Sequence, residues 1–277
     1  MSTNLATIYL PYVDEVFTAE SKRLLITNND FSWSGANTVK VYKVTTAPMN
    51  DYDRDGTGTN FSRYGAVSGL DATTEEFTLK KDRSFTFAID KLDKDETANV
   101  LVASSALARQ VREVVIPEVD AYTYGVMCAN AGIKPDAVTL TKDNIYGEII
   151  KANTALDNAN VPETSRVIIV TPDVYFLMKQ SSDIIMETDI GSDMRLKGVV
   201  SNLDGAIVVK VPAVRLPEKF GFMIAHYSAT VSPIKLEEFK IHEDPVGISG
   251  TLVEGRINYD AFVLDNKKNG IYYQVQA

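Results

Sequence analysis

The sequence predicts an α+β fold, and three features of its pattern support that prediction. A helical pattern runs from Asp93 to Ala131 with a single glycine and a single proline. A region of mixed helical and strand character covers 143–231, and the alternation typical of antiparallel strands covers 232–277. With 277 residues and a mass of 30.5 kDa, the chain has room for one large domain or two small ones.

Composition excludes several classes of protein. The chain carries 37 acidic and 28 basic residues, for a formal net charge of -9, so it lacks the basic balance that general nucleic-acid binding requires. An acidic surface is compatible with a wall that lies beside DNA without adhering to it, and equally compatible with an ordinary cytosolic protein. No apolar run approaches the length of a membrane span, and the N-terminus lacks the pattern of a secretion signal. The single cysteine, Cys128, is expected to be a small buried apolar residue.

The 93–131 pattern predicts a long helix. Asp93 is expected to cap its start, with Glu96 as the capping partner three residues on. A helix of about 38 residues would be roughly 57 Å long. Pro117 lacks an amide hydrogen and predicts a kink or short break. Two interpretations stay open: two core helices split at Pro117, or a long spine that other subunits or sheets cover. The expected apolar face comprises Val100, Ala103, Leu107, Val111 and Val114.

The N-terminal third is expected to contain an arm and a long hairpin. Residues 1–38 are either an arm that packs on a neighbour or the first helix of a domain. Residues 39–90 contain two strand patterns, at Thr38–Thr45 and from Phe77 to Ile89. The polar connection at 46–76 is longer than structureless loops in compact domains usually are. A projecting hairpin that packs on another molecule explains this length, and so does a disordered loop.

The mixed region at 143–231 predicts alternating helices and buried strands. Residues 145–156 have the pattern of an amphipathic helix, and Thr171-Pro172 is a cap followed by a first-turn proline. Short apolar runs predict strands at 166–170, 206–211 and 220–225, with a turn at Asp204-Gly205 before the second. Residues 182–202 are expected to be loop.

The C-terminal region predicts a return to antiparallel strands. Apolar and polar residues alternate from Val253 to Val263, as in a long strand with one buried face. Residues 265–270 are expected to turn the chain, and 271–275 to pair back on the long strand.

Catalytic and metal-binding motifs are scarce in this sequence. His226 and His242 lie outside any zinc or catalytic pattern, and no P-loop, nucleophile elbow or dinucleotide fingerprint occurs. Asp51, Asp53 and Asp55 have the spacing that opens a calcium loop, but the twelfth position is Ser62 where a glutamate is required. A calcium-dependent binding module built on these three residues is therefore one hypothesis, and an Asp-rich turn is the other. A third class, an α/β enzyme using 143–231, lacks a recognisable nucleophile. We expect no catalytic residues, no cofactor and no enzymatic activity.

The order of parts and several short strings resemble the HK97-type major capsid protein of tailed bacteriophages, particularly those of phages and prophages of Gram-positive bacteria. An arm, an extended loop, a spine helix, a mixed lobe and returning antiparallel strands follow one another as in that family. The similar strings are Thr38-Val39-Lys40-Val41-Tyr42, Met49-Asn50-Asp51-Tyr52, Arg63-Tyr64-Gly65, Lys81-Asp82-Arg83-Ser84-Phe85-Thr86-Phe87-Ala88-Ile89-Asp90, Asp95-Glu96-Thr97 and Val115-Ile116-Pro117-Glu118-Val119-Asp120-Ala121-Tyr122.

This resemblance implies a division into five segments and a structural function. The segments are an N-terminal arm (1–38), an extended β-hairpin loop (39–90), a peripheral domain with the spine helix (91–142), an axial domain (143–231) and returning peripheral strands (232–277). Pentamers and hexamers of the chain would form an icosahedral virion shell around double-stranded DNA, without sequence-specific DNA contacts and without a membrane, assembled in the cytoplasm of the bacterial host.

Partners of the shell also follow from the resemblance. Portal and decoration proteins are possible partners. The arm begins almost at Met1, which implies a separate scaffolding protein or none. A related alternative is the shell of an encapsulin nanocompartment, which shares the fold and encloses cargo enzymes.

Overall fold

The structure is a computed structural model that describes residues 20–28, 38–56, 62–67, 69–96, 102–181, 184 and 199–277. The chain divides into two compact units, one formed by Gly35–Leu79 and a larger one formed by the remainder. The larger unit combines helices with several sheets, which confirms the predicted α+β class.

A five-stranded sheet is the centre of the larger unit. Its order is β12-β7-β4-β6-β5, with β4 and β6 parallel and the other neighbours antiparallel. The strands are β4 (Arg166–Val170), β5 (Val199–Leu203), β6 (Ala206–Lys210), β7 (Phe220–His226) and β12 (Ile271–Val275). The three strands predicted in this region are confirmed. The prediction of loop at 199–202 is wrong, because the Asp204-Gly205 turn, with φ of 49° and 75°, folds β5 back onto β6.

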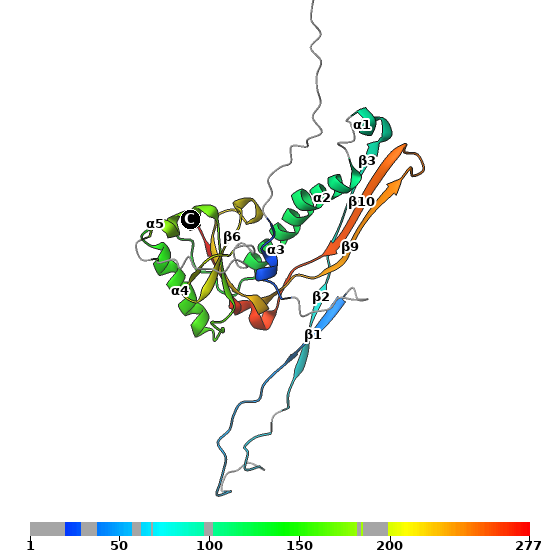
Figure 1. Ribbon diagram of the computed structural model, residues 1–277. Helices are drawn as coiled ribbons and strands as arrows, with labels where there is room; N and C mark the ends of the chain where they lie inside the picture. Colours follow the sequence, from blue (N-terminus) through cyan, green and yellow to red (C-terminus); the bar gives the residue numbers. More distant parts are fainter. Residues whose placement is uncertain are drawn as a thin grey trace, which may run out of the picture. The chain divides into compact units, whose positions relative to one another are not determined.

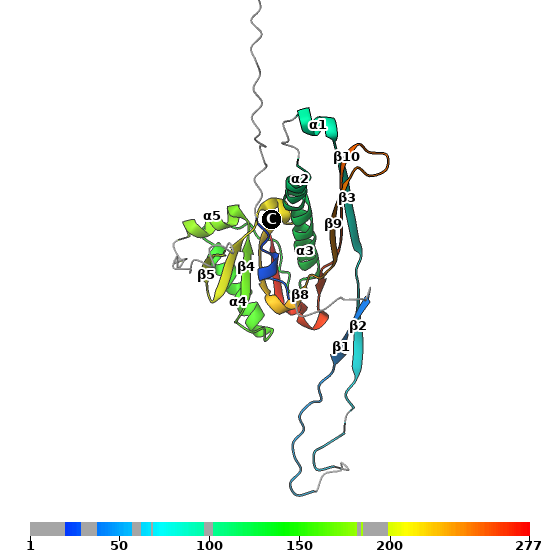
Figure 2. The ribbon, with the colours of Figure 1, turned by 45° about the vertical axis from the view of Figure 1, so that its right-hand side comes forward.

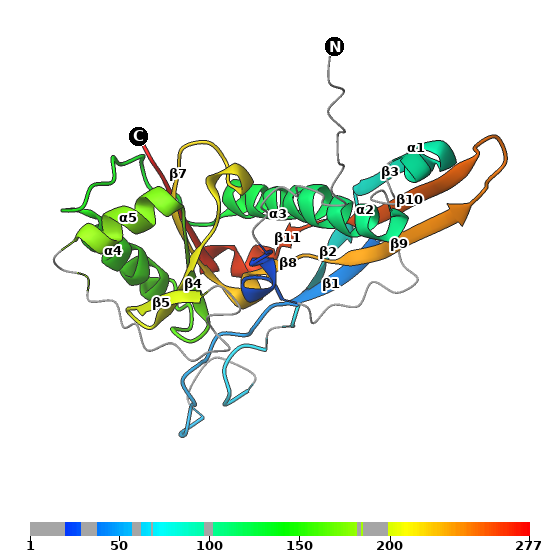
Figure 3. The ribbon, with the colours of Figure 1, turned by 45° about the horizontal axis from the view of Figure 1, so that its top comes forward.

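Helices cover both faces of this sheet (Figures 1 and 3). Helices α4 (Ile145–Asn158) and α5 (Pro172–Gln180) lie on one face, and α3 (Ile116–Asn130) lies on the other. Strand β4 shows the two-sided burial, since Val167 and Ile169 belong to the core under α3, whereas Ile168 and Val170 belong to the core under α4 and α5. A continuous apolar run is the pattern that such a strand requires.

The two outer helices begin where the sequence predicts. The predicted apolar face of α4 is fully buried, and it consists of Ile145, Ile149, Ala152 and Leu156. At the start of α5, the Thr171 hydroxyl accepts a hydrogen bond from the Val174 amide at 3.2 Å, which satisfies one free amide of the first turn. In the described part of the chain, no helix is both long and apolar enough to cross a membrane.

The spine begins later along the chain than the predicted start near Asp93. A short helix, α1 (Lys91–Glu96), precedes α2 (Ala103–Gln110), and residues 97–101 lie outside the described chain. The expected cap at Asp93 is wrong, because the Asp90 carboxylate accepts the Leu92 amide at 2.8 Å and Asp93 lies within the first turn. Val102 has extended backbone angles (φ −96°, ψ 127°), so the spine begins at Ala103.

A turn of π-helix, η2 (Val111–Val115), joins α2 to α3 directly before Pro117. The Ile116 amide reaches the Val111 carbonyl, five residues back. In an ordinary α-helix the Pro117 ring would crowd the Glu113 carbonyl, and the wider turn accommodates it, so the predicted irregularity takes this form. The inserted residue rotates the apolar face: Val114 is 47% exposed and Val115 is 8% exposed, so the prediction that Val114 lies on the buried face is wrong.

A three-stranded antiparallel sheet packs along the spine (Figure 2). Its order is β3-β10-β9, with β3 at Lys81–Asp90, β10 at Gly250–Tyr259 and β9 at Ile234–Glu243. Ile257 and Tyr259 of β10 form a small core with Val115 and Val119 of the spine. The remaining elements of the larger unit are η1 (Arg23–Leu25), η3 (Ala213–Arg215), η4 (Tyr227–Ala229), β8 (Thr230–Val231), β11 (Phe262–Val263) and η5 (Asp265–Gly270).

Two predicted pairings are wrong. The alternation between Phe77 and Ile89 belongs to two strands with different partners, since β2 ends at Thr78 and β3 begins at Lys81. The strand at 271–275 does not pair back on the long strand; η5 carries the chain to β7, where Ile271 lies opposite Ala225. Ile271 and Tyr272 are both buried, on opposite faces, which only a sheet covered on both sides permits.

The smaller unit is an antiparallel hairpin of β1 (Thr38–Val44) and β2 (Ala72–Thr78). Thr38 lies opposite Thr78, and Val44 lies opposite Ala72. Within the long connection, the Asp53 amide donates to the Arg63 carbonyl at 2.9 Å, so the described part of the loop folds back on itself.

Candidate functional site

The hairpin presents large apolar side chains at its surface. Met49 is fully exposed, and Tyr42, Tyr64 and Val67 are each more than 70% exposed. The Tyr52 and Tyr64 rings meet edge to face with centroids 5.1 Å apart. Gly65 (φ +87°) permits this closure, because a Cβ there would lie 2.7 Å from the Asn50 Cβ. An ordered loop tip with exposed aromatic side chains is typical of a surface that binds another molecule.

The three candidate calcium ligands lie in this tip. The Asp53 carboxylate accepts the Gly56 amide at 2.8 Å, as in an Asx-turn, and Asp51 and Asp55 are exposed. Across the described ranges, no group of three or more acidic, histidine or cysteine side chains is arranged to hold a metal ion. The calcium hypothesis for Asp51, Asp53 and Asp55 stays a prediction.

The face of the β3-β10-β9 sheet that points away from the spine carries paired charges. The Arg256 guanidinium donates to both oxygens of Asp82, at 2.9 and 2.5 Å. Lys240 pairs with Glu238 at 2.6 Å, and His242 lies 3.3 Å from Glu254. These pairs are exposed, so each contributes little to stability, and their alternating signs make a polar surface suited to a polar partner or to water.

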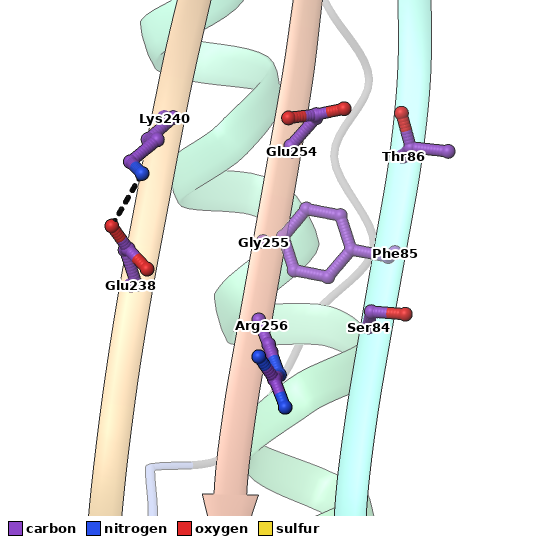
Figure 4. Close-up of a pocket in the computed structure, with 8 residues that line it drawn as sticks. All are labelled: Ser84, Phe85, Thr86, Glu238, Lys240, Glu254, Gly255 and Arg256. Carbon is purple, nitrogen blue, oxygen red and sulfur yellow. Dashed lines mark ion pairs between the residues drawn. The ribbon is translucent and has the colours of Figure 1, made fainter.

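A hollow of about 410 Å³ interrupts this face above Gly255. Figure 4 shows the Phe85 ring lying across Gly255, with Glu238 and Lys240 on the neighbouring strand. A Cβ at position 255 would lie 2.3 Å from Phe85 Cζ and 2.8 Å from Phe239 Cδ1. Glycine is therefore required here by the packing of two aromatic rings.

Substitution of Gly255 by alanine tests this packing. We expect Gly255→Ala to lower the free energy of unfolding by about 1–3 kcal/mol, because the new methyl group displaces the Phe85 ring. In a Phe85→Leu background the same substitution is expected to cost less, since the shorter side chain leaves room. Urea denaturation measures both values. The control, Glu254→Ala, removes an exposed neighbour and is expected to stay within about 0.5 kcal/mol of wild type.

The charge pairs on this face also predict a pH dependence. The hydrogen bond from Arg256 lowers the pKa of Asp82, and that from Lys240 lowers the pKa of Glu238. A lowered pKa in the folded state means stability that is present above the unfolded-state pKa and is lost as pH falls through the folded-state pKa. Asp82→Asn is therefore expected to flatten the acid limb of the stability-against-pH curve, measured by urea denaturation from pH 7 to pH 2.5. An unchanged acid limb would contradict a contribution from this pair.

The histidines and the cysteine lie apart from one another. The His226 ring accepts the Ser228 amide at 3.3 Å, and burial lowers its pKa, whereas His242 is on the exposed sheet face. Burial raises the pKa of the Cys128 thiol to about 12, as befits the small buried residue predicted from the sequence. The Ser228 hydroxyl lies 2.9 Å from the same ring nitrogen of His226, Nδ1.

Sequence reasoning missed two buried carboxylates. Asp120 on α3 and Asp260 after β10 are each 1% exposed. The only signal in the sequence is an acidic residue next to apolar positions, Val119 before Asp120 and Tyr259 before Asp260, and that signal does not reveal which partners fold against it.

Comparison with solved structures identifies the class of fold. Structures of bacteriophage capsids align along nearly the whole chain, so the chain has a phage capsid fold, which confirms the resemblance seen in the sequence at the level of fold. The capsid structure of the cyanophage P-SCSP1u aligns with a TM-score of 0.75 and 16% identity, covering 99% of this chain and 93% of that one.

Two further structures agree with this assignment. The asymmetric unit of the mature capsid of bacteriophage PhiM1 aligns with a TM-score of 0.72 and 11% identity, covering 99% of this chain and 92% of that one. A structure from Mycobacterium phage Che8 aligns with a TM-score of 0.76 and 19% identity, covering 98% and 96%. No protein-family model matches the sequence, and no curated protein sequence matches it.

Proposed function

We propose that the chain is a structural major capsid protein that assembles into an icosahedral shell around phage double-stranded DNA. The observation that carries this proposal is the alignment of 98–99% of the chain with structures whose descriptions include phage capsids. A fold shared over the full length, with no part of the chain left over, favours the same kind of assembly.

The exposed hairpin supports the proposal independently. Its apolar tip and the paired charges of the β3-β10-β9 sheet offer two surfaces of different character on one chain. Contacts between unlike surfaces of identical copies form closed rings, and rings joined by a second contact form shells. Obligate contacts of this kind bury more than the roughly 800 Å² per partner of standard interfaces.

The proposal assigns functions to five segments. Residues 1–38 form the arm, 39–90 the extended loop, 91–142 the peripheral domain with the spine, 143–231 the axial domain and 232–277 the returning strands. Pentamers and hexamers of the chain form the virion shell in the host cytoplasm, with scaffolding, portal or decoration proteins as additional partners. The net charge of -9 suits a wall that encloses DNA without binding its sequence, and we propose no enzymatic activity.

Electron microscopy of the purified chain tests the proposal. We expect negative staining to show closed, uniform particles at moderate protein concentration, together with a fast-sedimenting species in ultracentrifugation. A chain that stays monomeric across salt, crowding and scaffold conditions contradicts it. Nuclease treatment of particles recovered from an infected host then separates a genome shell, which protects DNA, from a shell around protein cargo.

A further inference from the structure

Two points in the larger unit matter here: a described segment of the N-terminal arm, and the residue at which the chain leaves the hairpin unit. The first is the segment Glu20–Asn28, which lies within the arm (1–38). The second is Lys80, the first residue after the hairpin unit. The first point contacts Asp120 of helix α3 directly, and the second is linked to Tyr122 of the same helix through Asp260.

The first point is held by Asp120 of α3. The Ser21 hydroxyl donates to one carboxylate oxygen at 2.6 Å, and Arg215 donates to the other at 2.9 Å. Arg215 also donates to the Glu20 carbonyl at 3.3 Å. Ile26 of the same segment is fully buried in the core under α3, so the segment is part of the folded unit.

The second point is held by Asp260. One oxygen of this buried carboxylate accepts the Lys80 amide at 2.8 Å. The other accepts the Tyr122 hydroxyl of α3 and the Ala261 amide, each at 2.8 Å. Tyr122 and Ala261 therefore fix the carboxylate that holds the Lys80 backbone where the hairpin ends.

Arg23 and Ser232 connect the two points. Arg23 donates to the Ser232 hydroxyl at 2.7 Å, and its Nε lies 3.9 Å from the Asp120 carboxylate. The Ser232 hydroxyl in turn lies 3.3 Å from the Asp260 carbonyl and 3.3 Å from the Thr123 hydroxyl. An unbroken series of polar contacts thus runs from Glu20 to Lys80. We call it the arm–hairpin network, and its side chains are Ser21, Arg23, Asp120, Tyr122, Thr123, Arg215, Ser232 and Asp260.

We propose that the arm–hairpin network couples the N-terminal segment to the root of the hairpin, so that release of one loosens the other. Buried polar groups have few alternative partners, and withdrawal of one member leaves its neighbour unsatisfied. Coupling of this kind is reciprocal. The proposal rests on contacts within one folded unit and does not depend on the proposed function. In a shell, it would let a partner that displaces the arm also change how firmly the hairpin is held.

Hydrogen exchange of backbone amides in the full chain tests the coupling. We expect Arg23→Met to increase exchange of the Lys80 amide about fivefold or more, which is within the range for interacting neighbours. In reverse, Asp260→Asn is expected to increase exchange of the Thr27 and Asn28 amides, which donate to the Arg23 and Thr230 carbonyls. Ser232→Ala alone removes the connecting hydroxyl, is mild enough to preserve the fold, and is expected to increase exchange at both points.

A matched control separates coupling from general destabilisation. Arg166 is also a buried arginine, and it pairs with Asp157 at 2.6 Å outside the network. Asp157→Asn is expected to leave Lys80 exchange unchanged. The proposal is overturned if Arg23→Met and Ser232→Ala increase amide exchange at Thr27 and Asn28 while exchange of the Lys80 amide stays as slow as in wild type. It is also overturned if Asp157→Asn increases exchange of the Lys80 amide to the same extent as the network variants do.

Discussion

Replacement of residues 51–66 by a short glycine-serine linker is expected to abolish closed particles while the larger unit stays folded. The larger unit has its own cores on both faces of the five-stranded sheet, and none of their residues comes from the deleted segment. Tyr52 and Tyr64 at the hairpin tip are exposed in the single chain, and we expect them to be buried only at an interface with a partner. Thermal unfolding measures the first expectation, and negative-stain microscopy with ultracentrifugation measures the second.

A substitution in the same tip provides the control for this deletion. Asp55 is exposed, and Asp55→Asn preserves the length and shape of the loop. This variant is expected to assemble like wild type, with or without a calcium chelator. Normal particles from the deletion variant would mean that the hairpin tip does not contribute to assembly.

Removal of the Asp120 carboxylate is expected to have the largest effect on stability of any single substitution described above. Asp120→Ala removes the buried carboxylate that lies 2.9 Å from the buried Arg215 and 3.9 Å from the largely buried Arg23. Breaking a buried pair by removing one partner costs about 3–5 kcal/mol, because the remaining charge stays buried and uncompensated. Urea denaturation with a circular-dichroism signal measures the loss.

Glu118 on the same helix offers a matched comparison. It pairs with Arg83 at 2.7 Å, and both side chains are at least 40% exposed. Exposed pairs contribute at most about 1 kcal/mol, so Glu118→Gln is expected to change stability only slightly. Equal losses from Asp120→Ala and Glu118→Gln would show that burial does not govern the strength of these pairs.

Local patterns predicted most of the elements at 143–231 correctly. The fully buried strand at 166–170, the helix at 145–158 and the Thr171 cap each depend on residues within one element, so their sequence contains the needed information. The exposed hairpin followed from an unusually long polar connection between two strand patterns, and the resemblance to capsid proteins followed from the order of all these parts.

The errors arose where distant residues decide the outcome. The strand at 271–275 pairs with β7, where apolar side chains cover both of its faces. Those side chains come from helices far away in the sequence. At the π-helical turn, the buried face of the spine shifts by one residue from the predicted one. Pro117 predicted an irregularity at this place but not its form. Asp120 and Asp260 acquire their importance from Arg23, Arg215 and Lys80, and no local pattern connects these residues.

The pairing of β3 with β10 sets the order in which the chain can complete its fold. Lys81 lies opposite Tyr259, so β3 is synthesised long before its partner strand β10 leaves the ribosome. Until then, the apolar face of β3 has no partner strand, and unpaired strand edges promote aggregation. The nascent chain is therefore expected to need protection by chaperones until β10 has been synthesised.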